Sequence, residues 1–332
     1  METFTVGSLF SGVGGICLGF KQSGFDVLWA NEKDKNACIT YLENFPHTLY
    51  EGKIEHLDAK QLSNVDVVTS GFPCQAFSIA GYRKGFKDHR GHLFKETMRI
   101  IDKIKPKTIL LENVKNLVSH DNGRTFQIMK EMVKDHGYSF IPRVLNSMEY
   151  GNVPQNRERI YIVGFLDEED FDPENPSDKF ICSYNFSHPK PVKLTKKVSD
   201  IVAGSVSKEF YYSTFMHYNK LLEYDWDKET IGQWRRIYVR QNKKNVCPTL
   251  TANMGTGGHN VPIIKDSIDF RKLTPKECFS FQGFPKNFKL PANMANSHLY
   301  KQAGNSVTVP VIKKIAHNIK SALAKKYNLM TV

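Results

Sequence analysis

Short apolar runs alternate with amphipathic segments along the first half of the chain. Runs rich in β-branched residues predict strands, and apolar residues at three- and four-residue intervals predict helices. The predicted strands cover residues 4–10, 26–31, 65–70, 108–112 and 159–165, and the predicted helices cover residues 16–23, 35–44, 94–104 and 125–136. Strands separated by helices form a parallel sheet with helices packed on its faces. The sequence therefore predicts a doubly wound α/β fold.

The pattern changes after about residue 188. Residues 188–270 show no regular period, carry several aromatic residues and include a glycine-rich segment, MGTGGHN. They predict a smaller domain of loops and short strands. Residues 310–326 are helical again, with apolar residues spaced to pack on a sheet. We therefore expect a first domain over residues 1–187, a second over 188–282, and a return to the first over 283–332.

Charge is unevenly distributed over the 332 residues, which are enough for about two domains. Lys and Arg number 46 against 34 Asp and Glu, a formal net charge of +12. Residues 278–332 contain no acid, residues 235–244 contain five bases, and residues 166–178 contain seven acids. Such a surface attracts nucleic acid, although a merely solvated basic surface is the alternative. No apolar run approaches the roughly 20 residues that span a bilayer, so no membrane partner is expected.

Six cysteines are present, at positions 17, 38, 74, 182, 247 and 278. No pair has C-x-x-C spacing, and no Cys/His cluster has the spacing of a zinc site. The N-terminal residues also lack the pattern of an export signal. We therefore expect reduced thiols in a cytoplasmic protein, and no metal site.

A glycine-rich turn, FSGVGG at residues 10–15, follows the first predicted strand. Glycines there allow the backbone to approach a ligand closely. The spacing is not the G-x-G-x-x-G of a dinucleotide site, which argues against a nucleotide-dependent oxidoreductase. Glu32 follows Gly12 by 20 residues, where an acid can hold two ribose hydroxyls. Together they predict a nucleoside cofactor without a pyrophosphate; a tight turn beside a surface carboxylate is the alternative.

Cys74 follows the third predicted strand, at the carboxyl edge where open α/β sheets bind ligands. A thiolate there can act as a nucleophile if nearby positive charge lowers its pKa, although a lone cysteine is more often structural. Residues 76–91 carry three glycines and four bases and predict a mobile basic lid.

Glu112 ends the next strand, and Arg157 and Arg159 precede the strand after that. A partly buried carboxyl at this edge can donate a proton. Arginines at i and i+2 point the same way and can make bidentate contacts. A salt bridge or a strand cap is the alternative for each.

Six segments occur together in one order: LFSGVGG, GFPCQ, LLENV, QNRERIYIVGF, RKLTPKECFSFQGFP and YKQAGNSVTVP. With them the chain closely resembles the C5-cytosine DNA methyltransferases of bacterial and phage restriction–modification systems, except near residues 170–245. The resemblance implies a Rossmann-like S-adenosylmethionine-dependent methyltransferase sheet plus a smaller irregular target-recognition domain. Residues 1–187 would bind the cofactor and catalyse, and residues 188–282 would recognise the target.

The resemblance also implies the cofactor, S-adenosylmethionine, which leaves as S-adenosylhomocysteine. The residues implied to bind it are Phe10, Ser11, Gly12, Gly14, Gly15, Glu32, Ile54, Pro73, Leu93, Asn305, Ser306 and Val307. One position departs from the family pattern, because Lys53 stands where an acid commonly accepts a hydrogen bond from adenine. Either Asp58 replaces that acid or the contact is absent.

For the reaction, the resemblance implies that Cys74 attacks C6 of a cytosine flipped out of the duplex. Glu112 would hydrogen-bond N3 and the exocyclic amine, and Arg159, with Arg157 behind it, would orient the base. C5 would then take the methyl group, and loss of the C5 proton and of Cys74 would restore the ring.

Double-stranded DNA is the implied partner. The residues expected to bind it are Gln75, Ser78, Arg83, Lys84 and Arg90 in the lid, and Arg235, Arg236, Arg240, Thr249, Gly257 and Gly258 in the recognition domain. The recognition arginines would either read guanine edges or hold phosphates. We expect a monomer in the cytoplasm of a bacterium or phage-infected cell, associated with the nucleoid and accompanied by a separate restriction endonuclease. An RNA (tRNA) cytosine-5 methyltransferase and an inactive DNA-binding protein are the alternatives.

Overall fold

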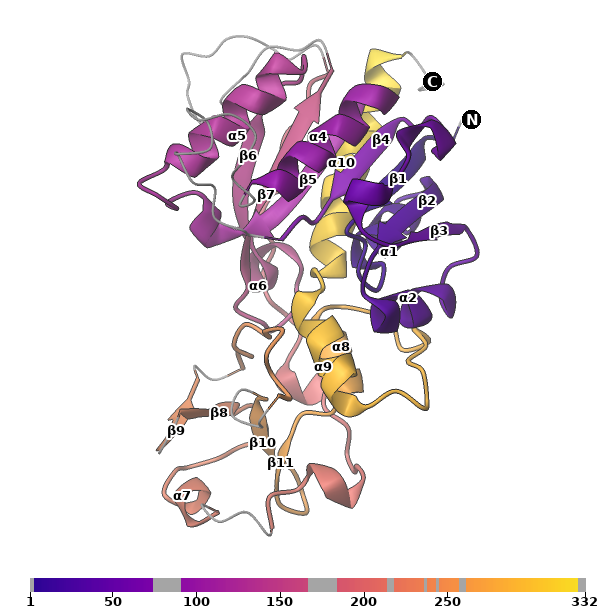
Figure 1. Ribbon diagram of the computed structural model, residues 1–332. Helices are drawn as coiled ribbons and strands as arrows, with labels where there is room; N and C mark the ends of the chain where they lie inside the picture. The colour runs from indigo at the N-terminus through magenta and orange to yellow at the C-terminus, as the bar shows by residue number, and fades with distance from the viewer. Residues whose placement is uncertain are drawn as a thin grey trace, which may run out of the picture.

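A seven-stranded sheet forms the upper part of the molecule in Figure 1, with the strand order β3-β2-β1-β4-β5-β7-β6. The computed structural model describes residues 3–73, 91–166, 184–213, 218–235, 238–242, 245–256 and 261–327. The first five strands pair in parallel, whereas β7 pairs antiparallel with both β5 and β6. The strands are β1 (Thr5–Leu9), β2 (Asp26–Glu32), β3 (Thr48–Glu51), β4 (Val67–Ser70), β5 (Thr108–Val114), β6 (Ile141–Asn146) and β7 (Glu158–Phe165).

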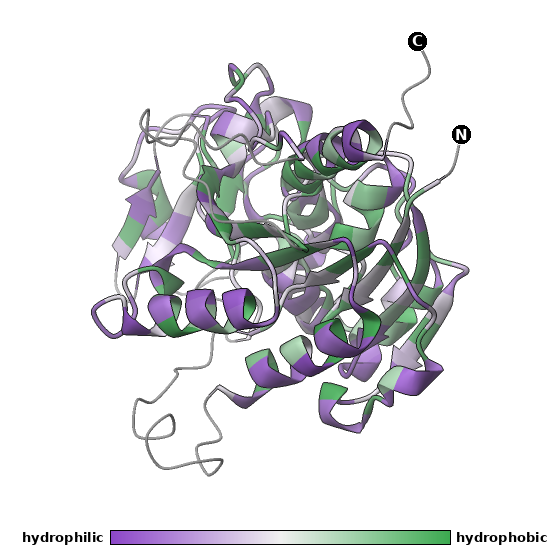
Figure 2. Cartoon of the chain, turned by 90° about the horizontal axis from the view of Figure 1, so that it is seen from above, coloured by the Kyte–Doolittle hydropathy of each residue, from purple (hydrophilic) through white to green (hydrophobic). Residues whose placement is uncertain are grey.

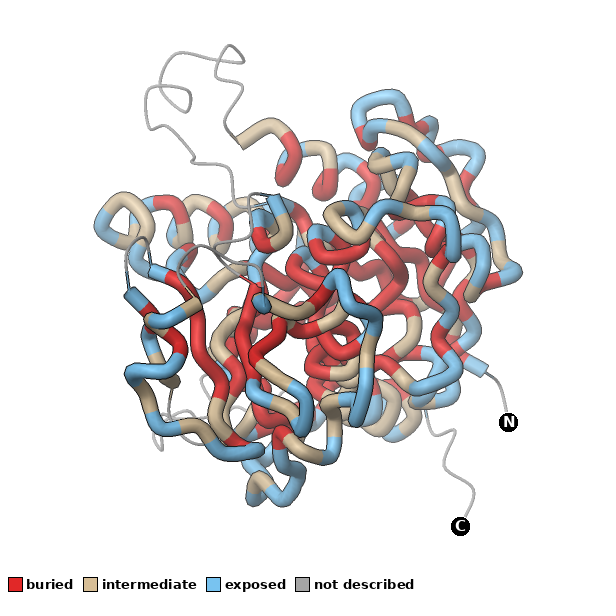
Figure 3. The backbone as a smooth tube through the Cα atoms, turned by 90° about the horizontal axis from the view of Figure 1, so that it is seen from below, coloured by how far each residue is buried: buried red, intermediate tan, exposed pale blue. Residues whose placement is uncertain are grey.

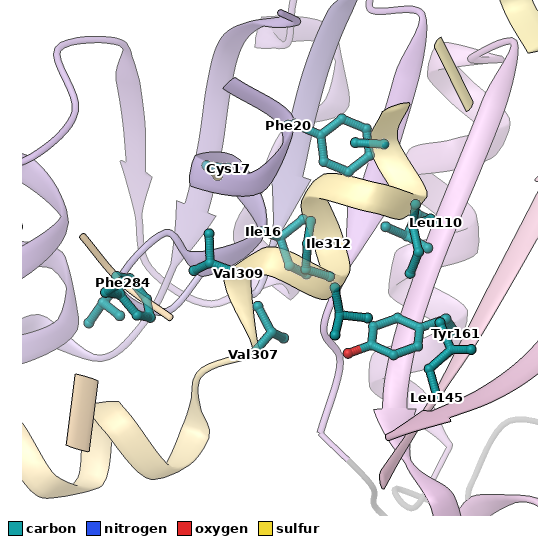
Figure 4. Close-up of a cluster of buried hydrophobic side chains, with 14 of the residues drawn as sticks. Ile16, Cys17, Phe20, Leu110, Leu145, Tyr161, Phe284, Val307, Val309 and Ile312 are labelled. Atoms are coloured by element: carbon teal, nitrogen blue, oxygen red, sulfur yellow. The ribbon is translucent and has the colours of Figure 1, made fainter. Parts of the chain in front are cut away.

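Helices cover both faces of this sheet. The helices of this part are α1 (Gly15–Lys21), α2 (Lys35–Leu42), α4 (His92–Ile104), α5 (Arg124–Asp135), α6 (Ser147–Tyr150) and α10 (Val309–Lys326). Buried side chains of α1, α2 and α10 form one apolar cluster with the sheet, and those of α4 and α5 form a second cluster on the other face. In Figure 4, Ile312 of α10 lies beside Ile16 of α1, with Leu110 and Tyr161 of the sheet nearby. The long C-terminal helix is therefore part of the first core.

The hydropathy of each element matches its place in these layers. Figure 2 shows the strands of the large sheet mostly green, between helices whose outward faces are purple. Figure 3 shows the same division as burial, with buried chain at the centre and exposed chain at the rim. Among the described residues, no helix combines the length and apolar character needed to cross a membrane.

A smaller antiparallel sheet, with the order β11-β10-β8-β9, lies in the lower part of Figure 1. It has its own apolar cluster, which includes Trp234 and Phe270. Helices α8 and α9 lie between the two sheets (Figure 1). The elements are α7 (Asn219–Leu222), β8 (Gly232–Arg235), β9 (Tyr238–Gln241), β10 (Ile263–Lys265), β11 (Phe270–Lys272), α8 (Pro275–Phe281) and α9 (Asn296–Asn305), with the single turns η1 (Ile54–His56), η2 (Ala59–Gln61), η3 (Lys115–Leu117), η4 (Val198–Asp200) and η5 (Lys208–Phe210).

A buried arginine joins the smaller sheet to α8. Arg271 of β11 is fully buried; its Nε lies 2.6 Å from Asp266 Oδ2 and its Nη2 lies 2.8 Å from Glu277 Oε1. Glu277 also forms a capping box with Thr274 at the start of α8. Two carboxylates compensate one buried guanidinium, which is the condition under which such a charge is tolerated. In the RKLTPKECF segment, Arg271, Thr274 and Glu277 therefore stabilise the fold.

The predicted doubly wound α/β fold is confirmed, and every predicted strand and helix is present with ends shifted by a few residues. One feature of the prediction is wrong: the sheet is not wholly parallel, because β7 runs against β5. The reason is the short connection from β6 through α6, which returns the chain beside β6 without a crossover helix. Two strands of this sheet were not predicted: β3 is short and half exposed, and β6 contains Pro142. The domain boundaries remain a prediction.

Candidate active site

A cavity of about 400 Å³ opens at the carboxyl ends of β1, β2, β4 and β5. This edge is where open α/β sheets bind ligands. Nine of the residues expected to bind the cofactor line it, together with Glu112, Arg157 and Arg159. The nine are Phe10, Ser11, Gly12, Gly15, Glu32, Pro73, Asn305, Ser306 and Val307. The structure therefore brings nine of the twelve predicted cofactor residues and the predicted catalytic carboxyl into one space.

The turn after β1 holds the Glu32 carboxylate. Glu32 Oε2 accepts a 2.7 Å hydrogen bond from the Gly12 N–H, and Oε1 accepts 2.8 Å bonds from the N–H groups of Lys33 and Asp34. Gly12 has a φ of 56°, a left-handed conformation that favours glycine, and a Cβ there would meet open space. Three backbone donors thus fix an acid at the cavity wall, with lone pairs left for a ligand's hydroxyls.

The segment after α9 closes the cavity against the same turn. A Cβ on Gly15 would lie 2.7 Å from Ser306 Oγ and 2.9 Å from Val307 Cγ2, so the two segments touch because residue 15 is glycine. Among the described residues, the buried Ser306 Oγ has no hydrogen-bond partner. A buried hydroxyl without a partner is costly unless a ligand or water satisfies it. Since Ser306 lines the cavity, it is a polar atom suited to a bound cofactor.

Three expected cofactor residues are not among the described residues that line the cavity: Gly14, Ile54 and Leu93. Gly14 has a φ of 87°, and a Cβ there would collide with the Phe45 ring, so its conformation and packing explain the glycine. Ile54 and Leu93 are buried in the apolar cluster on the other face of the sheet. Their side chains contribute packing beneath the site.

The acid that the family pattern places beside the adenine has no counterpart at position 53 or 58 in the described lining of the cavity. The Asp58 carboxylate accepts a hydrogen bond from the Lys60 N–H at the start of η2, and neither Lys53 nor Asp58 is among the described lining residues. Asp34 and Lys301 do line the cavity and form an ion pair, with Lys301 Nζ 2.6 Å from Asp34 Oδ2. This pair was not predicted from the sequence, because its members are 267 residues apart.

Glu112 and Arg159 lie together at the wall of the cavity. Arg159 Nε is 3.4 Å from Glu112 Oε1, and both side chains are largely buried. In the β5–β7 ladder Arg159 pairs with Val114, two residues beyond Glu112. Burial raises the pKa of the Glu112 carboxyl above its ordinary value, while the charges of Arg159 and Arg157 act in the opposite direction. Glu112 therefore holds a proton more readily than an exposed glutamate does.

Arg157 faces the protein backbone. It is 2% exposed, and its guanidinium donates to the carbonyl oxygens of Leu250 (2.8 Å), Gly304 (3.2 Å) and Ser306. Burial, followed by the neighbouring charge of Arg159, lowers its pKa to about 9, so it stays charged at neutral pH. Arg157 thus ties the segment that contains Leu250 to the segment that closes the cavity.

Two buried glutamines complete this junction, and no role was predicted for either of them from the sequence. Gln155 Nε2 donates to the Phe281 carbonyl at 2.6 Å, and its Oε1 accepts from the Leu250 N–H at 3.2 Å. Gln282 Nε2 donates to the Ala303 carbonyl at 2.8 Å. Gln155 lies in the segment QNRER, and Gln282 lies in the segment FQGFP.

Cys74 lies outside the described residues, as do Gln75, Ser78, Arg83, Lys84 and Arg90 of the expected lid. Pro73, the last described residue before them, lines the cavity, and Asn113 Nδ2 donates to the Phe72 carbonyl at 2.9 Å. The chain therefore leads to Cys74 from a point fixed beside Glu112. The four described cysteines, Cys17, Cys38, Cys247 and Cys278, are buried, and burial raises the pKa of each thiol. None of these four is poised as a thiolate.

A second hollow of about 590 Å³ brings together Arg235, Arg240 and Thr249, three of the residues expected to bind DNA. Arg235 and Arg240 come from β8 and β9, and Arg235 Nη2 donates to Gln233 Oε1 at 3.2 Å. Asn156, directly before Arg157, also lines this hollow. Arg236, Gly257 and Gly258 lie outside the described residues. The described part of the chain contains no cluster of metal-ligating side chains.

The fold and this cavity define an α/β enzyme that binds a nucleoside cofactor beside a buried carboxyl group. A family model for the C-5 cytosine-specific DNA methylases matches residues 4–321. The chain therefore belongs to the C-5 cytosine-specific DNA methylases. It is a DNA cytosine-5 methyltransferase that uses S-adenosylmethionine, as the resemblance predicted.

Relatives match along nearly the whole chain. Type II methyltransferase M.Bsp6I of Bacillus sp. (strain RFL6) is 52% identical over 322 residues, 96% of this chain and 99% of that protein. Type II methyltransferase M.HhaI of Haemophilus parahaemolyticus is 36% identical over 330 residues, 95% of this chain and 94% of that protein.

Solved structures share the fold. The S. pombe Dnmt2 methyltransferase has a TM-score of 0.70 at 18% identity, covering 98% of this chain and 100% of that one. A DNMT2 mutant of Spodoptera frugiperda has a TM-score of 0.69 at 20% identity, covering 97% and 100%. At these identities the likeness concerns the fold alone.

Proposed function

We propose that this methyltransferase modifies one cytosine within a specific short sequence of duplex DNA, as the protective partner of a separate restriction endonuclease. The observation that carries the proposal is the shared cavity. The glycine turn with Glu32, and the pair Glu112–Arg159, line the same space. A cofactor and a flipped-out base would therefore lie in contact, as transfer between them requires.

The cofactor would lie between the turn after β1 and the segment after α9. Glu32, whose carboxylate is already held by three N–H groups, would accept hydrogen bonds from the ribose hydroxyls. Ser306 Oγ, which has no partner among the described residues, would bond a polar atom of the same ligand. S-adenosylmethionine supplies an electrophilic methyl group when bound.

Glu112 would act on the base. With its pKa raised by burial, the carboxyl can remain protonated and donate to N3 of the cytosine while Arg159 fixes its orientation. Cys74 would add as a thiolate to C6, which moves electron density to N3 and makes C5 nucleophilic. After C5 gains the methyl group, the C5 proton leaves and the C6–S bond breaks, returning the electron pair to the thiolate. Arg157 would position this machinery without touching the base.

The second sheet would contact the duplex. Arg235, Arg240 and Thr249 line one hollow next to the active-site cavity, which suits residues 188–282 as a target-recognition domain. Residues 1–187 and 283–332 would then form the catalytic and cofactor-binding domain. The net charge of +12 favours a polyanion. We further propose that the protein is a monomer in the cytoplasm of a bacterial or phage-infected cell, associated with the nucleoid.

The tRNA alternative receives less support. Both quoted relatives with high coverage are named Type II methyltransferases. Comparing methyl incorporation into duplex DNA and into tRNA tests the choice directly, and incorporation confined to tRNA would refute the proposal.

The mechanism is tested with 5-fluorocytosine at the target position. Fluorine cannot leave C5 as F⁺, so the enzyme should stay bonded to the DNA through Cys74 after methyl transfer. Cys74→Ser should abolish trapping, because a neutral hydroxyl is a much weaker nucleophile than a thiolate. Changing Cys17, Cys38, Cys182, Cys247 or Cys278 singly to Ser should leave trapping intact in variants that fold. Peptide mapping that places the adduct on another residue would refute the assignment of Cys74.

A further inference from the structure

The hollow beside the active site is lined by groups that donate hydrogen bonds. Its described lining includes two arginines and several side-chain amides, and none of those residues is an acid. Arg235 and Arg240 are exposed, and no described carboxylate pairs with either of them. The hollow therefore offers positive charge and N–H groups without an acidic acceptor to compete for them.

The orientation of one amide in this hollow is fixed by the backbone. Asn146 Oδ1 accepts from the N–H groups of Met148 (3.3 Å) and Arg157 (3.2 Å), which identifies its other terminal atom as the NH₂ group. That NH₂ donates to Asn156 Oδ1 at 2.7 Å. The Asn156 oxygen is thus engaged, and its Nδ2 is the donor left for the hollow.

Asn156 is also held through its backbone. Its N–H donates to the Cys247 carbonyl at 2.8 Å, and its carbonyl accepts from Thr249 Oγ1 at 2.6 Å. Asn156 is therefore a pre-organised donor, placed directly before Arg157 in the chain and so next to the reaction cavity.

We infer that this hollow takes the major-groove edge of a guanine next to the target cytosine, with Asn156 Nδ2 and the Arg240 guanidinium donating to O6 and N7. The inference rests on the proposed function and names part of its recognised sequence. Guanine presents two adjacent acceptors in the major groove, whereas adenine and cytosine each present an amino donor, which would face the donors of Asn156 and Arg240. A DNA phosphate shares the acceptor chemistry, so the experiment must separate the two.

The experiment begins with the wild-type enzyme. Bisulfite sequencing of DNA from cells that express it gives the recognised sequence, and kcat/KM is then measured on duplexes with 7-deazaguanine at each guanine in turn. We expect one guanine next to the target cytosine at which the loss of N7 lowers kcat/KM by about 10-fold or more. If no guanine next to the target responds, the inference is wrong.

Asn156→Asp is the matching protein change, because it keeps the oxygen that Asn146 needs and replaces only the donor NH₂. It should lower kcat/KM on the natural site by about 10- to 100-fold, and much less on the duplex with 7-deazaguanine at the responding position. Asn287→Asp, at an exposed position after α8, introduces the same charge and should change kcat/KM on both duplexes alike.

Two results would overturn the inference. An equal loss for Asn156→Asp on all duplexes would do so, as would a loss removed by methylphosphonate linkages, because either identifies a phosphate contact. A separate result concerns the proposed function: if the wild-type enzyme does not methylate duplex DNA, that proposal fails first. If the wild-type enzyme methylates duplex DNA normally and 7-deazaguanine changes kcat/KM at no position, only the inference fails.

Discussion

The backbone of Gly304 lies directly against that of Thr251. A Cβ atom on Gly304 would fall 2.2 Å from the Thr251 carbonyl oxygen, a distance that no side chain can accept without moving one of the two segments. Gly304 lines the cofactor cavity, and Thr251 lines the neighbouring hollow. The two proposed binding sites therefore meet at a contact that only glycine allows.

Gly304→Ala should consequently weaken both sites. We expect a loss of about 1–3 kcal/mol in the free energy of unfolding, typical of overpacking, and weaker binding of both S-adenosylmethionine and DNA. Urea denaturation and cofactor titration measure these effects. Gly204→Ala is the control, since a Cβ there meets nothing within 4 Å and should leave both values unchanged. Equal behaviour of the two variants would contradict the prediction.

Arg157→Lys should destabilise the fold more than it perturbs the chemistry. A lysine cannot reach the three carbonyls that the guanidinium bonds, and it leaves buried groups unsatisfied. The expected loss in the free energy of unfolding is about 3–5 kcal/mol. Arg124→Lys, which disturbs an exposed ion pair with Asp121, should change that free energy by less than about 0.5 kcal/mol. A stable Arg157→Lys protein would show that the carbonyls find other donors.

Glu112→Gln should lower kcat by about 10²–10⁴-fold, the usual contribution of a proton donor, while cofactor affinity is retained. Glu158→Gln, at the first residue of the neighbouring strand β7 and paired with exposed Lys115, should retain its kcat. Similar losses in both variants would argue against a special role for Glu112.

The same carboxyl predicts a pH dependence of activity. Because burial raises the pKa of Glu112, the protonated form persists to a higher pH than for an exposed glutamate. Wild-type kcat should fall as pH rises through that pKa, since deprotonation removes the donor. The Gln variant should lack this limb in a pH–rate profile; a profile of unchanged shape would exclude Glu112 as its source.

His188 should make stability depend on pH. It is buried, its Nε2 bonds the Ile141 carbonyl, and burial lowers its pKa to about 4, with the charge of Arg143 acting in the same direction. The unfolded chain binds the proton near pH 6.5, so stability present above that pH is lost as pH falls toward 4. The expected loss at pH 5 is about 2 kcal/mol. Urea denaturation at pH 7 and pH 5 should show this loss in the wild type and a smaller one in His188→Gln.

The direction of β7 illustrates where prediction from the sequence ended. The strand itself was predicted, and the resemblance implied that Glu112 and Arg159 both contact the target base. In the parallel sheet that was expected, however, residues preceding a strand lie at the amino edge, opposite the end of β5. Only because β7 runs antiparallel does Arg159 come within 3.4 Å of Glu112. Strand direction depends on a connection and on neighbours, and neither is visible in the apolar pattern of a single strand.

The sequence by itself determined the features that depend on residues close together in the chain. Hydrophobic periodicity predicted the strands and helices, and the turn at residues 10–15 with Glu32 predicted a nucleoside site, because spacing along a β-turn-α unit fixes both ends. Tertiary structure alone decided the contacts between distant segments: Arg157 with Leu250, Gly304 with Thr251, and Asn156 held by Asn146. Those contacts depend on how two sheets and α9 pack together, and packing is a property of the whole chain rather than of any local pattern.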